Sequence, residues 1–77
     1  MPTVLRQSGF SVMIYTKDHA PMHVHVKHQG NVAIIEFEDE VTLRNNYGFN
    51  RRQLQQALLI VTENRQMLIE RWREIYG

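Results

Sequence analysis

The sequence contains no cysteine, which excludes disulfide cross-links and any zinc site built on thiolates. Nine basic and eight acidic side chains nearly balance, so the net charge gives no electrostatic footprint for nucleic acid or a membrane. Long apolar runs are also missing, which argues against a membrane span and a signal peptide. We therefore expect a cytoplasmic protein with no membrane association, forming a single domain over residues 1–77. Its stability must come from packing or from a partner.

The first half of the chain, residues 1–44, has the patterns of a small sheet. Runs rich in β-branched and aromatic residues alternate with polar segments, and Gln29-Gly30-Asn31 has the composition of a tight hairpin turn. The expected strands are residues 10–16, 22–28 and 32–37, with 41–44 as a short fourth strand and 1–8 as an edge segment.

The second half, residues 49–76, predicts a helix. Asn50 and Gln53 have the spacing of a capping box, and Phe49 and Leu54 that of a hydrophobic staple. Apolar residues then recur at helical spacing, namely Leu54, Leu58, Val61, Leu68, Trp72 and Ile75. We predict one long helix from about residue 51 to residue 75, with a weak point at residues 62–64. The expected fold class is α+β, a three- to four-stranded antiparallel sheet with one long C-terminal helix packed on one face.

These lengths predict uncovered apolar surface. A helix of about 25 residues spans roughly 37 Å, whereas strands of about six residues span roughly 20 Å. The outer turns, which carry Leu68 and Trp72, should therefore overhang the sheet. The expected strands are apolar on both faces, although one helix covers only one. We take this as evidence for a protein partner or a homo-oligomer. The alternative is that the N-terminal segment covers the second face.

His23 and His25 are the first candidate site. Side chains alternate along a strand, so both histidines should lie on one face, with Val24 and Val26 on the other. We expect no metal and no cofactor here, because no acidic or sulfur ligand is well placed nearby in the sequence. The pair could act as catalytic general acid and base, as in cleavage of RNA without a metal.

Other interpretations of the histidines stay open. They could be polar strand residues packed against Tyr15, Glu36 or a partner. His19 and His28 would join them only if their loops folded back.

Arg51 and Arg52 are the second candidate site. They occupy the first helical turn, where the helix dipole disfavours positive charge. Together with Arg44 upstream, they could bind an anion such as phosphate, or the carboxylates of a partner. The alternative is a solvated pair neutralised by the acidic residues 38–40. Trp72 is expected in the core or an interface, and Arg65 on an ordinary solvated helix face.

The order of these segments resembles a bacterial family called domain of unknown function 4160. The residues that carry the resemblance are Met1 to Arg6, Asp18 to Val26, Gly48 to Leu54, Glu63-Asn64-Arg65 and Trp72. The sequence departs from the family pattern in two places. Only Pro21 remains of a usual run of prolines, and Asn50 stands where serine is common.

The resemblance implies a role and motif positions. Members resemble stand-alone proteins encoded beside a member of domain of unknown function 2442, as in type II toxin–antitoxin modules, where this family would supply the toxin. His23, His25, Arg51 and Arg52 are the matching motif positions, without assigned roles. The resulting expectation is a toxin-like protein with a cognate antitoxin-like partner, acting on RNA if it is an enzyme. The alternative is a non-catalytic protein-binding module or a homo-oligomeric interaction protein.

Overall fold

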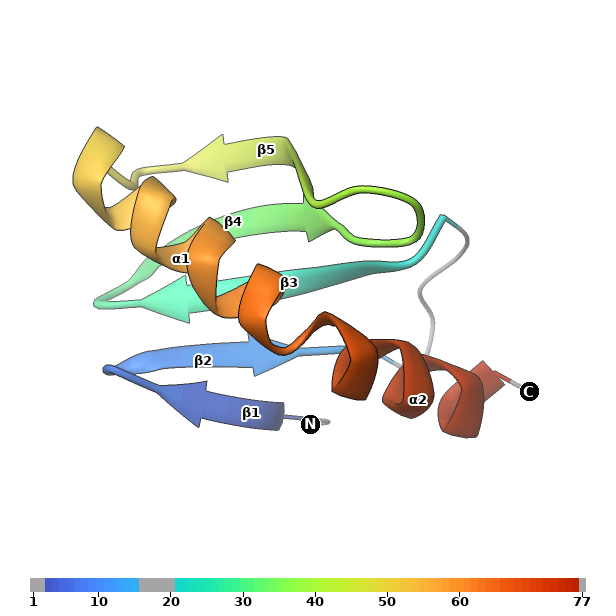
Figure 1. The fold of residues 1–77 in the computed structure, drawn as a ribbon. Coiled ribbons are helices and arrows are strands. Elements are labelled where there is room, and N and C mark those ends of the chain that lie inside the picture. The colour runs from blue at the N-terminus through green and yellow to red at the C-terminus, as the bar shows by residue number, and fades with distance from the viewer. Residues whose placement is uncertain (1–2, 16–20, 77) are drawn as a thin grey trace.

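The computed structural model describes residues 3–15 and 21–76, and it has the expected α+β class (Figure 1). Five strands precede two helices. The strands are β1 (Thr3–Gln7), β2 (Phe10–Met13), β3 (His23–His28), β4 (Asn31–Glu36) and β5 (Thr42–Tyr47), and the helices are α1 (Arg51–Glu63) and α2 (Arg65–Tyr76).

The sheet is an antiparallel meander in the order β1-β2-β3-β4-β5. The prediction of three to four strands was therefore too low. Ser8 and Gly9 have φ angles of 54° and 81°, so they form a tight turn that folds residues 3–7 back onto β2. Gln29 and Gly30, with φ angles of 51° and 83°, form the predicted hairpin turn between β3 and β4.

The prediction of one long helix was also wrong, because the helical segment breaks at Asn64, within the weak point predicted at residues 62–64. The Thr62 hydroxyl donates to the Leu58 carbonyl at 2.8 Å, a bond that bends helices. The Asn64 side-chain amide donates to the Ile60 carbonyl at 2.8 Å and to Gln7 Oε1 on β1 at 3.2 Å. Asn64 therefore ends α1 and fastens the break to the edge of the sheet.

The break removes the predicted overhang. Figure 1 shows α2 turning at the end of α1 and staying beside the sheet. Leu68, Ile69 and Trp72 are buried, with exposed fractions of 0%, 8% and 7%. The outer helical turns are thus covered by the protein's own sheet, and they give no argument for a partner.

The start of α1 is as predicted. The Asn50 side chain accepts from the Gln53 backbone at 2.9 Å, and the Gln53 side chain accepts from the Asn50 backbone at 3.1 Å. This capping box satisfies two amides that the first helical turn leaves without partners.

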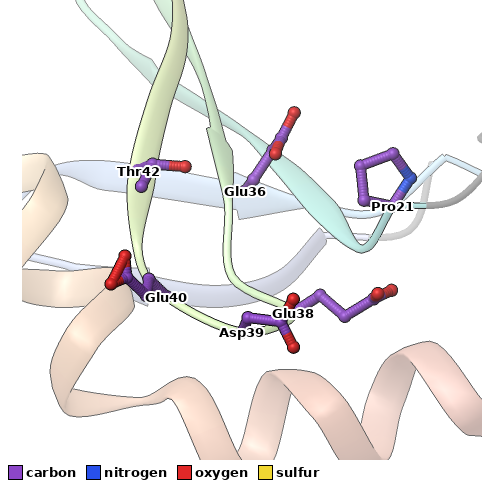
Figure 2. A pocket seen from close by; sticks show the side chains of 6 residues that line it. All are labelled: Pro21, Glu36, Glu38, Asp39, Glu40 and Thr42. Carbon is purple, nitrogen blue, oxygen red and sulfur yellow. The ribbon is translucent and has the colours of Figure 1, made fainter.

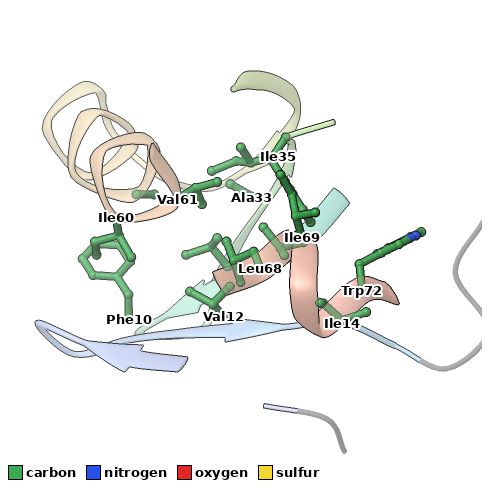
Figure 3. Close-up of a cluster of buried hydrophobic side chains, with 14 of the residues drawn as sticks. Phe10, Val12, Ile14, Ala33, Ile35, Ile60, Val61, Leu68, Ile69 and Trp72 are labelled. Atoms are coloured by element: carbon green, nitrogen blue, oxygen red, sulfur yellow. The ribbon is translucent and has the colours of Figure 1, made fainter. Parts of the chain in front are cut away.

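A single core fills the space between the sheet and the helices (Figure 3). Its strand residues alternate with residues on the other face of the sheet, as in any strand. The fully buried members with the largest side chains include Phe10, Ile14, Val24, Val26, Ile35, Phe37, Ile60 and Leu68.

The second face of the sheet, which we call the open face, lies opposite the core that the helices cover (Figure 1). At its histidine end this face is not free of the helices, because His23 is 6% exposed and its ring packs on Trp72 of α2. The alternative expectation was that the N-terminal segment covers this face. That expectation was wrong for residues 3–7, because they pair with β2 as the edge strand of the sheet. The register assigns to the open face Arg6, Ser11, Met13, His23, His25, Lys27, Val32, Ile34, Glu36 and Tyr47.

Candidate functional site

His23 and His25 lie side by side on the open face. Their ring centroids are 5.7 Å apart, and the ring planes are tilted by 58°. Val24 and Val26 point into the core with no exposed surface, so the predicted division of β3 between the two faces is confirmed. Across the sheet, His23 pairs with Glu36, and His25 lies between Met13 and Ile34.

His23 is held in place by its neighbours. It is 6% exposed, and its Nδ1 lies 2.8 Å from the Pro21 carbonyl oxygen. Since a carbonyl only accepts, Nδ1 carries the proton, and in the neutral ring Nε2 is the basic nitrogen. The Trp72 ring packs on the same imidazole, with centroids 5.6 Å apart. Trp72 is therefore a core residue, as predicted.

His25 packs against Tyr15. The two rings meet edge to face with centroids 4.6 Å apart, and the Tyr15 hydroxyl lies 3.5 Å from the Met13 sulfur. The expectation that a histidine packs against Tyr15 is thus confirmed for His25. His25 is half-buried, so it is the more accessible of the two imidazoles.

A carboxylate and a guanidinium lie on the same face. Glu36 is the cross-strand neighbour of His23, and Arg44 Nε lies 3.8 Å from Glu36 Oε2. A register shift between Ile34 and Ile35 marks the irregular pairing of β4 with β5 beside Arg44. Glu36 was expected only as one of the alternative packing partners of the histidines, and the pairing of β3 with β4 places it beside His23.

Arg51 and Arg52 lie far from the histidines. They begin α1 directly after β5, whose last residue, Tyr47, pairs with Val32. Val32 pairs with Lys27, and His23 lies four residue steps further along β3, or roughly 13 Å, at the other end of the sheet. Both arginines are exposed, and their side chains form no hydrogen bond or ion pair within the described ranges. Of the three predicted arginines, the fold thus brings only Arg44 towards the histidines, through its contact with Glu36.

The remaining histidines do not enlarge the cluster. His28 lies on the helix side, where its ring stacks on Phe10 at 4.3 Å and its Nδ1 donates to the Gly9 carbonyl at 3.0 Å. His19 lies outside the described residues. Within residues 3–15 and 21–76, no group of three or more histidine and acidic residues is placed to hold a metal ion. Neither α1 nor α2 is long and apolar enough to cross a membrane.

An acidic pocket of about 260 Å³ borders the histidine end of the sheet (Figure 2). Its lining consists of Pro21, Glu36, Glu38, Asp39, Glu40 and Thr42. The carboxylates should repel a polyanion from this end. An anionic ligand that reaches His25 must therefore approach along the rest of the open face.

Arg65 holds the loop that carries these carboxylates. Its guanidinium donates to the backbone carbonyls of Phe37 at 2.9 Å and Asp39 at 3.3 Å, and also to that of Glu38. The expectation that Arg65 belongs to a solvated helix face was wrong. Nothing in the local sequence signals these contacts, because the carbonyls lie on the segment between β4 and β5.

Comparison with known proteins identifies a family. The model of a family described as domain of unknown function (DUF4160) matches residues 9–73. No curated protein and no solved structure gives a significant match.

Proposed function

The chain belongs to the DUF4160 family, and we propose that it is the toxin-like half of a two-gene bacterial module that acts on RNA in the cytoplasm. A small cognate protein, encoded beside it and belonging to domain of unknown function 2442, would neutralise it. The observation that carries the proposal is the pair of imidazoles, 5.7 Å apart, on the face of β3 opposite Val24 and Val26.

Two imidazoles at this separation suit cleavage of RNA by its own 2′-hydroxyl. One imidazole removes the hydroxyl proton as the 2′-oxygen attacks phosphorus. The bond from phosphorus to the 5′-oxygen then breaks, and the second imidazole gives its proton to that oxygen. This acid–base work typically contributes about 100-fold or more to a rate. His25 is the better placed to meet substrate, whereas His23 is buried and oriented by the Pro21 carbonyl.

Arg44 takes the role of the arginine nearest the scissile phosphate. Its guanidinium is about half exposed and reaches the open face beside Glu36. An exposed ion pair of this kind contributes little to stability, so Arg44 can exchange its carboxylate for a phosphate at low cost. Arg51 and Arg52 are too distant for this role, and they are better suited to binding the partner.

The partner would neutralise the protein by covering the open face. Half-buried Val32 and Ile34 offer apolar surface there, and Tyr47 adds a ring that is 57% exposed. A partner that buried these side chains would also block access to His25.

Growth measurements test the proposal. The chain is expressed alone and together with its neighbouring gene. We expect impaired growth with the chain alone and recovery with both genes. His25→Gln, which removes the imidazole, should abolish the impairment, and unimpaired growth with the parent chain alone would count against a toxin.

A non-catalytic function is the second candidate. The apolar side chains of the open face and the separation of Arg51 and Arg52 from the histidines favour a module that only binds proteins. A second copy of the chain could then occupy the open face as a homo-oligomer. In that case His25→Gln would leave every measured effect of expression unchanged.

A further inference from the structure

One row of the open face joins basic and aromatic side chains across all five strands. The strand register aligns Arg6, Ser11, Lys27, Val32 and Tyr47, one residue from each strand. Adjacent strands lie about 4.8 Å apart, so the row is roughly 19 Å long. Lys27 is two residues from His25 on the same strand and face, a separation of about 7 Å. The row therefore runs directly beside the candidate catalytic residue.

The cations in this row are not neutralised by the protein. Within the described ranges, neither Arg6 nor Lys27 forms an ion pair or a side-chain hydrogen bond. Arg6 is exposed and Lys27 is half-buried. At the other end of the open face, the pocket lining contributes acidic side chains. The open face is therefore polarised, and a polyanion is drawn to the row and repelled from the pocket.

Tyr47 adds a feature that charge alone does not require. Its side chain is 57% exposed at the end of the row, where it pairs with Val32. An aromatic ring on an uncovered sheet can stack on an unpaired base, and neighbouring cations can contact the phosphates. In a duplex the base faces are already stacked, so this arrangement selects single strands.

We infer that the row formed by Arg6, Lys27 and Tyr47 binds single-stranded RNA. Tyr47 stacks on a base, and Arg6 and Lys27 contact the backbone, which brings the adjacent phosphodiester to His25. The inference rests on the proposed function and names the surface that would present its substrate. An acidic protein could also satisfy the two cations, but it would gain nothing specific from an aromatic stacking platform at Tyr47.

Fluorescence anisotropy with labelled oligouridylate tests the inference on the full chain. Tyr47→Ala should weaken binding about fivefold or more, the usual loss for one base stack. Arg6→Gln combined with Lys27→Gln should weaken binding and reduce the salt slope of log K by about 1.4, the value for two phosphate contacts on a single strand. Unchanged affinity in both variants would overturn the inference.

Matched controls lie on the helices. Leu59 is 56% exposed, so Leu59→Ala removes a similar exposed apolar side chain away from the row. Arg71→Gln combined with Arg73→Gln removes the same charge from α2. Both controls should bind like the parent, and thermal unfolding should show that all variants remain folded. If Arg71→Gln combined with Arg73→Gln weakened RNA binding as much as the changes in the row, the binding would be non-specific electrostatic attraction and the inference would be overturned.

The competitors separate RNA from an acidic partner. Unlabelled single-stranded RNA should displace the probe better than a duplex or polyglutamate of equal charge. Equal displacement by polyglutamate would assign the row to an acidic protein and overturn the inference. The assay measures binding alone, so a chain that binds through this row without cleaving RNA would refute only the proposed enzyme activity. Cleavage that is unaffected by changes in the row would refute only the inference.

Discussion

His23 on β3 packs against Trp72 on α2, with ring centroids 5.6 Å apart and planes tilted by 55°. Trp72 also meets Phe37 edge to face at 6.3 Å and Tyr76 at 4.4 Å. The last helix thus reaches one of the two candidate catalytic residues through a single buried ring. The contact makes the position of His23 depend on the packing of α2.

Trp72→Ala should destabilise the protein by about 3–5 kcal/mol, because it removes a large buried ring and leaves a cavity. A domain of this size has a total stability of about 4–12 kcal/mol, so the loss is severe. The midpoint of urea unfolding measures it. Leu59→Ala on the exposed surface of α1 should change stability by less than about 0.5 kcal/mol. Similar losses of stability in Trp72→Ala and Leu59→Ala would contradict the burial of Trp72 between α2 and the sheet.

Arg65→Ala should cost about 1.5–3 kcal/mol, because the guanidinium donates to several loop carbonyls that would lose a charged donor. Arg65→Lys should recover only part of this loss, because a lysine ammonium group lacks the several fixed N–H donors of the planar guanidinium. Arg71→Ala is the control, because Arg71 is about half exposed and forms only an ion pair with Glu74 at 3.5 Å. Chemical denaturation compares the three, and an Arg65→Ala variant as stable as Arg71→Ala would disprove the loop-anchoring role.

Gly48→Ala should destabilise the protein more than Gly30→Ala. Both glycines have positive φ angles, 107° and 83°, which a side chain disfavours. An added Cβ at Gly48 would also lie 2.3 Å from Asn31 Oδ1, whereas nothing lies within 4 Å at Gly30. We expect a loss of about 1–2 kcal/mol at Gly30 and a larger loss at Gly48. Combining Gly48→Ala with Asn31→Ala should restore part of the lost stability. Equal unfolding midpoints for Gly48→Ala and Gly30→Ala would refute a clash between the added Cβ and Asn31.

Tyr47→Asp should abolish capture of the neighbouring gene product if the partner covers the open face. Leu59→Asp introduces the same charge at a residue of nearly equal exposure on α1, and it should leave capture intact. Co-purification from cells that express both genes measures the difference. If only Leu59→Asp abolished capture, the partner would bind the helices and not the open face.

The sequence predicted best those features whose contacts are local. The capping box of Asn50 and Gln53 and the hairpin turn at Gln29-Gly30 need only neighbouring residues, and both are present. The alternation of His23 and Val24 follows from strand geometry alone. The contacts of these features lie within a few residues along the chain, so their local sequence is enough to predict them.

The features that were missed depend on partners distant in the sequence. Asn64 has a low helix propensity, but the break is fastened by Gln7, which lies on the first strand. Arg65 looks like a surface residue until the loop after β4 folds against it. The separation of Arg51 from the histidines follows from the strand register, which places β5 and the start of α1 at the far end of the sheet. No periodicity in the sequence encodes these pairings.

Cleavage of single-stranded RNA by the purified chain is the decisive test of His25 as a catalytic residue, with His25→Gln compared against His28→Gln. His28 lies on the helix side of the sheet, stacked on Phe10, so it controls for the loss of an imidazole outside the open face. We expect the parent and His28→Gln to cleave RNA, and His25→Gln to be slower by about 100-fold or more. Cleavage by His25→Gln at the parental rate, or no cleavage by the parent, would contradict this expectation.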